Sequence, residues 1–358
     1  MTRPIGYYVH HQGAGHWHRA CAVAAALDRP CALLGTFTGI DTAGTPGPVI
    51  NLPNDRLAEG FDGRDGEPER PLSLHYAPLA HSGLRTRMAR IAAWAAETDP
   101  ALLVVDVSCE VALFARLLSL PTLVVRLAGT RTDLPHLEAF RSADRLIAPF
   151  PEVLESAATP DWVRAKTHYA GLLGPAPAAP DGSEDGSVVV VFGRGGAGGA
   201  RADLAAAARA LPERDWHVLG PVAGEAATPP NLHLHGWVPD VEPWIARAAL
   251  VVGGAGDGVV AAVAARGKRF VCLPEERGYG EQVEKARGLA RLGAAVLHEG
   301  WPNPARWGEL VAAGLALDPG RIGSLAEPEA LARTAAFIAE RAAWWERRGD
   351  AAPIRAIV

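Results

Sequence analysis

The sequence is poor in cysteine and lysine, and it contains neither a long apolar run nor a run of basic residues. Its cysteines, at positions 21, 31, 109 and 272, show no CxxC spacing and have apolar neighbours, so we expect reduced thiols in a cytoplasmic protein. No stretch has the length of a membrane span, and the first residues lack the apolar core of a signal peptide. A net charge of −5 without basic runs argues against a nucleic-acid partner.

The length of 358 residues favours two domains, and the pattern of apolar runs predicts strands alternating with helices in both halves. Predicted strands are 5–10, 31–36, 101–105, 122–127, 145–148, 168–170, 187–192, 216–219, 232–235, 250–252 and 269–273. Predicted helices are 17–27, 84–96, 111–118, 202–211 and 328–348. This alternation is typical of an α/β protein with two doubly wound, Rossmann-like parallel sheets that face a cleft.

A stretch rich in Pro, Gly and Ala, residues 171–186, reads as a linker between the two halves. We therefore predict an N-terminal domain at 1–170 and a C-terminal domain at 187–326. The remaining residues, 327–358, contain the last predicted helix.

The most informative motif is the glycine-rich turn at 253–258, which lies between a β-branched strand and an Ala/Val-rich helix. Backbone N–H groups at such a helix start, with no Cβ in the way, favour an anion. A second apolar strand and a polar loop then lead to Glu281 and Gln282. This arrangement resembles the donor half of the GT-B nucleotide-sugar glycosyltransferases, the MurG-like (family 28) and natural-product (family 1) types in particular.

The resemblance implies that the glycine turn holds a diphosphate, that Glu281 and Gln282 hold the donor sugar, and that the segment at Trp237 reads the base. The last helix would cross back to pack on the first domain. The donor-side residues that match are Gly193, Arg194, Gly195, Trp237, Val238, Gly254, Ala255, Gly256, Asp257, Glu281 and Gln282.

Three positions depart from the family pattern. The usual His before the turn is Val252, and the usual Ser or Thr after its last glycine is Asp257. The acid that grips the ribose in MurG-like proteins falls near Ala261 and Ala262 and is absent. An acid beside a diphosphate repels it, so we expect Asp257 either to face sugar hydroxyls or to cap its own helix.

The run from Gly193 to Gly198 also satisfies the G-x-G-x-x-G pattern of dinucleotide-binding proteins. That fingerprint calls for an acid at the end of the next strand, where this chain has Leu219-Gly-Pro. NAD(P) binding is therefore the weaker interpretation.

A second turn, from Gly13 to His16, resembles the acceptor-side loop of MurG-like enzymes. A histidine oriented by a carboxylate suits the base that glycosyl transfer needs, and Asp106 ends a predicted parallel strand. We predict His16 as the base and Asp106 as its partner; in the competing interpretation, His16 only contacts donor phosphate or caps structure. Further acceptor-side candidates are His11, Gly13, Gly15, Glu110, Arg126 and Arg131, of which His11 and Glu110 are the alternates for catalysis.

Arg126, Arg131, Asp133 and His136 are placed in a polar loop, where isolated charges are often simply solvated. His10, His11, His16 and His18 point in different directions on a strand, turn and helix, so no metal site is predicted.

The leading hypothesis is an inverting, metal-independent glycosyltransferase that uses a nucleotide sugar as co-substrate, UDP-linked in our preference, with a small-molecule acceptor as in natural-product biosynthesis. No further cofactor is expected, because helix dipoles and N–H groups stabilise the leaving phosphate in such folds. A nucleotide-sugar epimerase or hydrolase, or a non-catalytic nucleotide-sugar binding protein, remains the alternative. The acceptor and the oligomeric state stay open.

Overall fold

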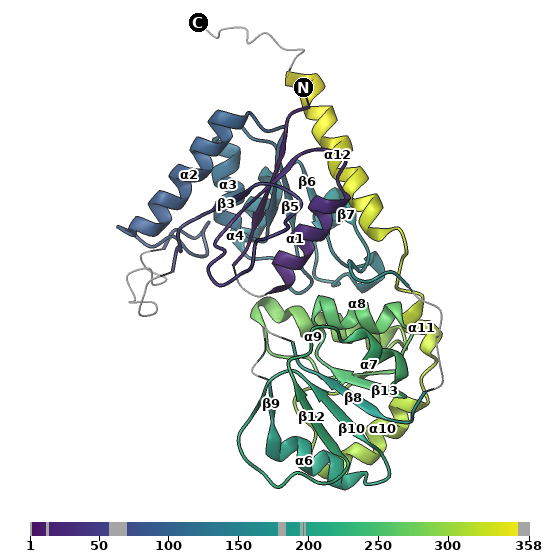
Figure 1. Cartoon of the computed structure of the whole chain (residues 1–358). Coiled ribbons are helices and arrows are strands. Elements are labelled where there is room, and N and C mark those ends of the chain that lie inside the picture. Colours follow the sequence, from purple (N-terminus) through teal and green to yellow (C-terminus); the bar gives the residue numbers. More distant parts are fainter. Residues whose placement is uncertain are drawn as a thin grey trace, which may run out of the picture.

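The computed structural model describes residues 2–11, 14–56, 70–177, 184–193, 196 and 198–349 and has two lobes, each built on a parallel sheet (Figure 1). The seven-stranded sheet of the first lobe has the order β3-β2-β1-β4-β5-β6-β7. Its strands are β1 (Ile5–Val9), β2 (Cys31–Gly35), β3 (Val49–Asn51), β4 (Leu102–Asp106), β5 (Thr122–Val125), β6 (Arg145–Ala148) and β7 (Thr167–Tyr169).

The second lobe has a six-stranded parallel sheet in the order β12-β10-β8-β13-β14-β15. Its strands are β8 (Val188–Val191), β10 (Trp216–Leu219), β12 (Leu232–Gly236), β13 (Leu250–Gly253), β14 (Phe270–Cys272) and β15 (Val296–Leu297). A short parallel pair, β9 (Gly199–Ala200) and β11 (Val222–Ala223), accompanies this sheet. The central strands are continuous apolar runs, as expected when helices cover both faces of a parallel sheet.

The helices that follow these strands cover the sheets. They are α1 (Ala14–Ala26), α2 (Ser82–Thr98), α3 (Cys109–Leu117), α4 (Leu134–Ser142), α5 (Asp161–Lys166), α6 (Arg201–Ala210), α7 (Glu242–Arg247), α8 (Asp257–Ala265), α9 (Glu281–Arg291), α10 (Trp307–Leu315), α11 (Pro319–Gly323) and α12 (Ala330–Gly349). Short 3-10 turns occur at Glu152–Leu154, Gly278–Gly280 and Pro304–Arg306. Within the described part of the chain, no helix is both long and apolar enough to cross a bilayer.

The last helix, α12, returns from the second lobe and packs along α1 of the first (Figure 1). Its Ile338 and Ala342 are buried in the apolar cluster that contains β1. Arg341 donates to both carboxylate oxygens of Asp144, at 2.7 and 2.9 Å. The predicted return of the C-terminal helix to the first lobe is therefore confirmed.

Strand order determines where a ligand would bind. In both sheets the order reverses direction beside the first strand, between β1 and β4 and between β8 and β13. Loops that leave the carboxyl ends of strands at such a switch point diverge and form a crevice. The predicted histidine turn follows β1, and Asp106 ends β4. The predicted glycine segments lie after β8 and at the end of β13.

One predicted loop is in part a helix. The sequence predicts a polar loop that includes Asp133 and His136, but α4 begins at Leu134, and the Asp133 side chain accepts from the backbone N–H of His136. An N-capping Asp followed by a proline in the first turn is a helix start signal that the polar composition obscured. His136 therefore has a fixed place in the first turn of α4.

Candidate active site

A cavity of about 1260 Å³ lies between the two lobes and is lined by residues of both. Most of the predicted site residues line it: His11, Gly15, His16, Glu110, Arg131, Gly193, Trp237, Val238, Gly254, Gly256, Asp257, Glu281 and Gln282. Asp106 and Ala255 are fully buried just behind the wall, each in contact with a lining residue. Gly13, Arg194 and Gly195 lie outside the described residues.

The predicted pair of His16 and Asp106 comes together at the carboxyl edge of the first sheet. His16 lies in the first turn of α1, and its Nδ1 is 3.0 Å from Oδ1 of Asp106, the last residue of β4. Burial alone would raise the pKa of the Asp106 carboxyl, but Arg19 and His16 outweigh this effect and hold it well below its usual range. The buried Asp106 is therefore an ionised group that can orient the imidazole.

Arg19, one helical turn after His16, connects this pair to the second lobe. Its Nη2 donates to both oxygens of Asp106, at 2.9 and 3.0 Å, and its Nη1 donates to Oδ2 of Asp257 at 3.2 Å. Asp257 also forms an ion pair with the Lys285 ammonium, which is fully buried in α9. Two carboxylates and two cations thus form a continuous chain from β4 to α9.

The environment of Asp257 contradicts one of the two arrangements expected from the sequence, the helix cap. Asp257 is the first residue of α8, and Gly256 is the N-cap residue, with no side-chain capping bond. The helix-cap interpretation is therefore wrong. Burial would raise the pKa of the Asp257 carboxyl, yet Lys285 and Arg19 lower it, so the carboxylate is charged and matched by two cations. This pairing offsets the repulsion that a bare acid would exert on a diphosphate.

Gln282 holds the glycine turn in place. Its Oε1 accepts from the backbone N–H groups of Ala255, at 2.9 Å, and Glu275, at 3.0 Å. A Cβ on Gly254 would lie 2.7 Å from the same oxygen, so a side chain there would displace the amide. Gly254 and Gly256 of the turn line the cavity, and the start of α8 beside them suits an anion.

A second link between the lobes is formed by Arg131 and Glu281. Arg131 Nη2 donates to Glu281 Oε2 at 3.2 Å, and its guanidinium lies 5.0 Å from the centre of the Tyr279 ring. The backbone N–H of Thr130 donates to the carbonyl of Tyr279 at 2.8 Å. Burial, followed by the charge of Asp257, raises the pKa of Glu281. The predicted donor-sugar residue and the predicted acceptor-side arginine are therefore direct partners.

Three acceptor-side candidates are engaged with other groups. Glu110 Oε1 accepts from the backbone N–H groups of His75 and Tyr76, at 2.7 and 3.1 Å, so it positions their loop. His11 Nδ1 lies 3.8 Å from Asp55, and burial lowers the pKa of His11. Arg126 does not line the cavity, because its guanidinium is buried against Glu155. The placement of Arg126 in the acceptor pocket is therefore wrong.

The positions that depart from the family pattern also have a structural reason. The place of the missing ribose acid is occupied by Ala261 and Ala262, both buried. A Cβ added to Gly174 would lie only 2.4 Å from the Cβ of Ala261. The backbone at Gly174 therefore packs closely against α8 at this position. An acid would not fit there without moving the segment that joins the lobes.

Sequence reasoning missed Arg19, Lys285 and the loop that carries His75. Arg19 had a usable signal, because it follows His16 by one helical turn and so lies on the same face of α1. Lys285 lies one turn after Glu281 in the same way. The loop at His75 follows a long segment without periodicity, and nothing local places it against α3.

No family model matches the chain, and neither does any curated protein sequence. Solved structures do match it. The glycotransferase of kitacinnamycin has a TM-score of 0.70 at 16% identity and covers 95% of this chain and 99% of its own. MurG of Acinetobacter baumannii has a TM-score of 0.66 at 16% identity, over 95% and 100%. VinC in complex with dTDP has a TM-score of 0.64 at 16% identity, over 95% and 99%.

These matches define the class of fold. The chain has the two-lobed GT-B fold of nucleotide-sugar glycosyltransferases, as its motifs predicted, with the C-terminal helix returning to the first lobe. The likeness extends over nearly the whole of each chain, and the cavity between the lobes lies at the switch points of both sheets.

Proposed function

We propose that this protein is an inverting glycosyltransferase that moves a sugar from a UDP-linked donor to a hydroxyl group of a small-molecule acceptor, as in natural-product biosynthesis. The observation that carries this proposal is the contact of His16 with the buried, ionised Asp106, joined through Arg19 to the start of α8. A base from one lobe thereby lies next to an anion-binding turn from the other.

In this mechanism the imidazole of His16 takes the proton of the acceptor hydroxyl. His16 Nδ1 lies 3.0 Å from both Asp106 Oδ1 and Arg19 Nη2. In this mechanism Nδ1 donates to Asp106, Arg19 keeps its bonds to the same carboxylate, and Nε2 is the basic nitrogen. The acceptor oxygen attacks the anomeric carbon as the bond from that carbon to the diphosphate oxygen breaks. Attack from the face opposite the leaving group inverts the configuration.

The leaving diphosphate would lie against the glycine turn at Gly254 and Gly256. Backbone N–H groups and the positive end of α8 stabilise the charge that develops on the departing oxygen. Arg19 and Lys285 add positive charge beside this point, and Asp257 forms an ion pair with each of them. No metal is required for the transfer step in this arrangement.

The donor half is proposed to bind the nucleotide across Gly193, Trp237 and Val238, with Glu281 toward the sugar. Trp237 has 51% of its surface exposed and lines the cavity, which supports a position for the base or ribose beside it. VinC was solved with dTDP, which makes dTDP the direct competitor of UDP. The two nucleotides differ at the base and at the ribose 2′ position, and the chain lacks the family's ribose acid.

Calorimetric titration with UDP, dTDP, GDP and NAD⁺, each with and without EDTA, tests the donor site. We expect micromolar binding of one pyrimidine nucleoside diphosphate, unchanged by EDTA, and none of NAD⁺. Binding of NAD⁺ alone would assign the chain to the dinucleotide-binding class instead.

Incubation with the donor sugar and a panel of hydroxylated aglycones, analysed by mass spectrometry and by anomeric couplings in NMR spectra, tests the reaction. A glycoside of inverted configuration supports the transferase. An epimer, or free sugar with nucleotide in the absence of acceptor, would favour the epimerase or hydrolase. Tight binding without any product would favour a binding protein.

A further inference from the structure

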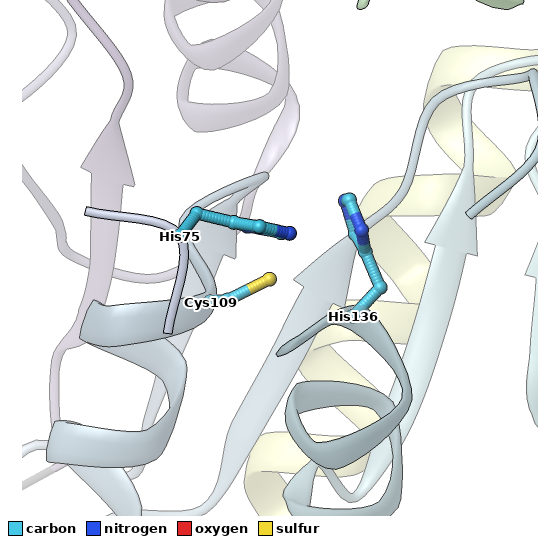
Figure 2. Close-up of side chains that lie close together, drawn as sticks. All are labelled: His75, Cys109 and His136. Carbon is cyan, nitrogen blue, oxygen red and sulfur yellow. The ribbon is translucent and has the colours of Figure 1, made fainter. Parts of the chain in front are cut away.

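Three side chains that can bind a transition metal converge on the acceptor-side wall of the cleft. One nitrogen each of His75 and His136 and the sulfur of Cys109 lie within 4.8 Å of one another. Figure 2 shows the side chains of His75 and Cys109 pointing toward His136 from neighbouring segments. Cys109 and His136 are buried and His75 is half-buried.

Asp133 lies outside this group of three but contacts both of its imidazoles, which makes it the candidate for a fourth ligand. Its Oδ1 lies 2.7 Å from His75 Nε2, and its Oδ2 lies 2.7 Å from His136 Nδ1. One carboxylate thus connects both imidazoles. Two imidazoles, one thiolate and one carboxylate form a donor set of the type that holds Zn²⁺ in a closed tetrahedral site.

The backbone around these ligands is well fixed. Cys109 is the first residue of α3 and His136 lies in the first turn of α4, two helices in mutual contact. The loop at His75 is held by Glu110, whose carboxylate accepts the backbone N–H of His75 at 2.7 Å. Three segments that are distant in sequence therefore bring their ligands together independently of any metal.

We propose that His75, Cys109, His136 and Asp133 form a structural binding site for Zn²⁺ or a similar divalent metal. Tetrahedral Zn–N and Zn–S bonds of about 2.0–2.3 Å require ligand atoms roughly 3.3–3.8 Å apart. The atoms of His75, Cys109 and His136 must therefore approach one another by up to about 1.5 Å, and the Asp133 oxygens must move away from the imidazole nitrogens by about 0.6 Å or more. The half-buried His75 and the partly exposed Asp133 side chains allow such a shift. Two negative ligands balance the charge of the ion.

Metal binding replaces the thiol proton of Cys109 by the metal and releases that proton to solvent, whereas each imidazole stays neutral and only changes its tautomer. The Arg131 guanidinium, whose Nη1 lies 3.1 Å from His136 Nε2, can only donate and must then move, because that nitrogen either binds the metal or carries the imidazole proton. The site would tie the acceptor-side loop at His75 to α3 and α4. It is separate from the His16–Asp106 pair, so the transfer step does not need the ion.

The test is a titration of the EDTA-treated full-length protein with Zn²⁺ and with Co²⁺. We expect one equivalent bound per chain, with a thiolate-to-cobalt charge-transfer band in the Co²⁺ spectrum. Cys109→Ser should abolish the band, and His75→Ala should weaken Zn²⁺ by roughly 100-fold, whereas Asp133→Asn should weaken it by about 10- to 100-fold. Because Cys109 is buried, the folding of each variant is checked by circular dichroism, and the half-buried His75 gives an independent result if Cys109→Ser fails to fold.

Two control variants identify metal bound elsewhere. Cys21→Ser alters a half-buried thiol in α1 and should leave the band intact. His235→Ala breaks a surface contact in which His217 Nδ1 lies 3.0 Å from His235 Nε2, and it should leave the stoichiometry at one. Absence of binding, or binding that survives both Cys109→Ser and His75→Ala, would overturn the proposal. UDP titration of the same variants measures the donor site independently, so that a failure of the metal proposal can be told apart from a failure of the proposed function.

Discussion

Arg19 and Asp257 form an ion pair across the cleft, with 3.2 Å between Nη1 and Oδ2. Arg19 belongs to the first lobe and Asp257 to the second, and the other end of the same guanidinium donates to the buried Asp106. The geometry of the proposed base therefore depends on the relative position of the lobes. Opening of the cleft would break the ion pair between Arg19 and Asp257, whereas the hydrogen bonds from Arg19 to Asp106 within the first lobe would remain.

Replacement of Arg19 by lysine should lower kcat by about 100-fold, because a single ammonium cannot donate to Asp106 and Asp257 at once and the imidazole loses its alignment. KM for the donor should change less than kcat. Steady-state kinetics at saturating acceptor measure this split. The matched control is Arg29→Lys, which alters an ion pair with Glu346 of α12 and lies outside the cavity lining. An equal loss of kcat in both variants would contradict a positioning role for Arg19.

The variant His16→Gln should lower kcat by roughly 10²- to 10⁴-fold, the range for removal of a general base. The Kd for UDP should stay within about threefold, because a base acts on the acceptor and not on the donor. Stopped assays and calorimetry on the same preparation give both values. The control is His298→Gln, which follows β15 and lies outside the cavity lining. A parallel loss of UDP affinity would mean that His16 contacts the donor phosphate instead.

Much of the architecture was predictable because apolar strands and glycine turns are local signals. β6 and β10 begin and end at the residues predicted for them, and both sheets are parallel and doubly wound as expected. The contact between His16 and Asp106 was also anticipated. Asp106 ends β4 and His16 lies in the first turn of the helix after the neighbouring strand β1, so the topology brings them to one edge of the parallel sheet.

What sequence reasoning could not supply is the pairing of charges across long distances along the chain. Lys285 and Asp257 lie on successive helices of one lobe, yet nothing local shows that the ammonium is buried against the carboxylate. In the sequence Arg126 is an isolated charge in a predicted loop, but in the structure it is buried and forms an ion pair with the buried Glu155. The ligands of the proposed metal site come from three segments without any common motif.

The variant Gly254→Ala should weaken UDP binding by about tenfold, close to the loss of one hydrogen bond at roughly 1–1.5 kcal/mol. Its Cβ would lie 2.7 Å from Gln282 Oε1 and push the amide away from the N–H of Ala255. Gly308→Ala in α10 is the matched control, because a Cβ there meets nothing within 4 Å. Calorimetry and thermal unfolding of both variants distinguish a donor-site effect from a general one.

A double-mutant cycle on Asp257 and Lys285 should reveal strong coupling. Asp257→Asn leaves the buried ammonium of Lys285 without its partner and should lower the free energy of unfolding by about 3 kcal/mol. This value is the lower end of the range for buried ion pairs, because the Asp257 side chain is 24% exposed. Lys285→Met should cost less, since Arg19 still neutralises Asp257. The double variant should recover most of the loss in urea unfolding. Additive losses would mean that the two groups do not stabilise each other.

Acidification should destabilise the protein through His10 at the end of β1. Burial, followed by the nearby His16 and His11, lowers the pKa of His10 from 6.5 to about 3, with Asp106 opposing and Arg87 adding to the shift. Between these values the unfolded chain binds a proton that the folded chain does not, so stability falls as pH falls from about 6.5 toward 3. The expected loss between pH 7.5 and 5 is at most about 2 kcal/mol. His10→Gln should remove this part of the difference in urea unfolding at the two pH values, and an unchanged difference would show that His10 takes up its proton without cost in the folded state.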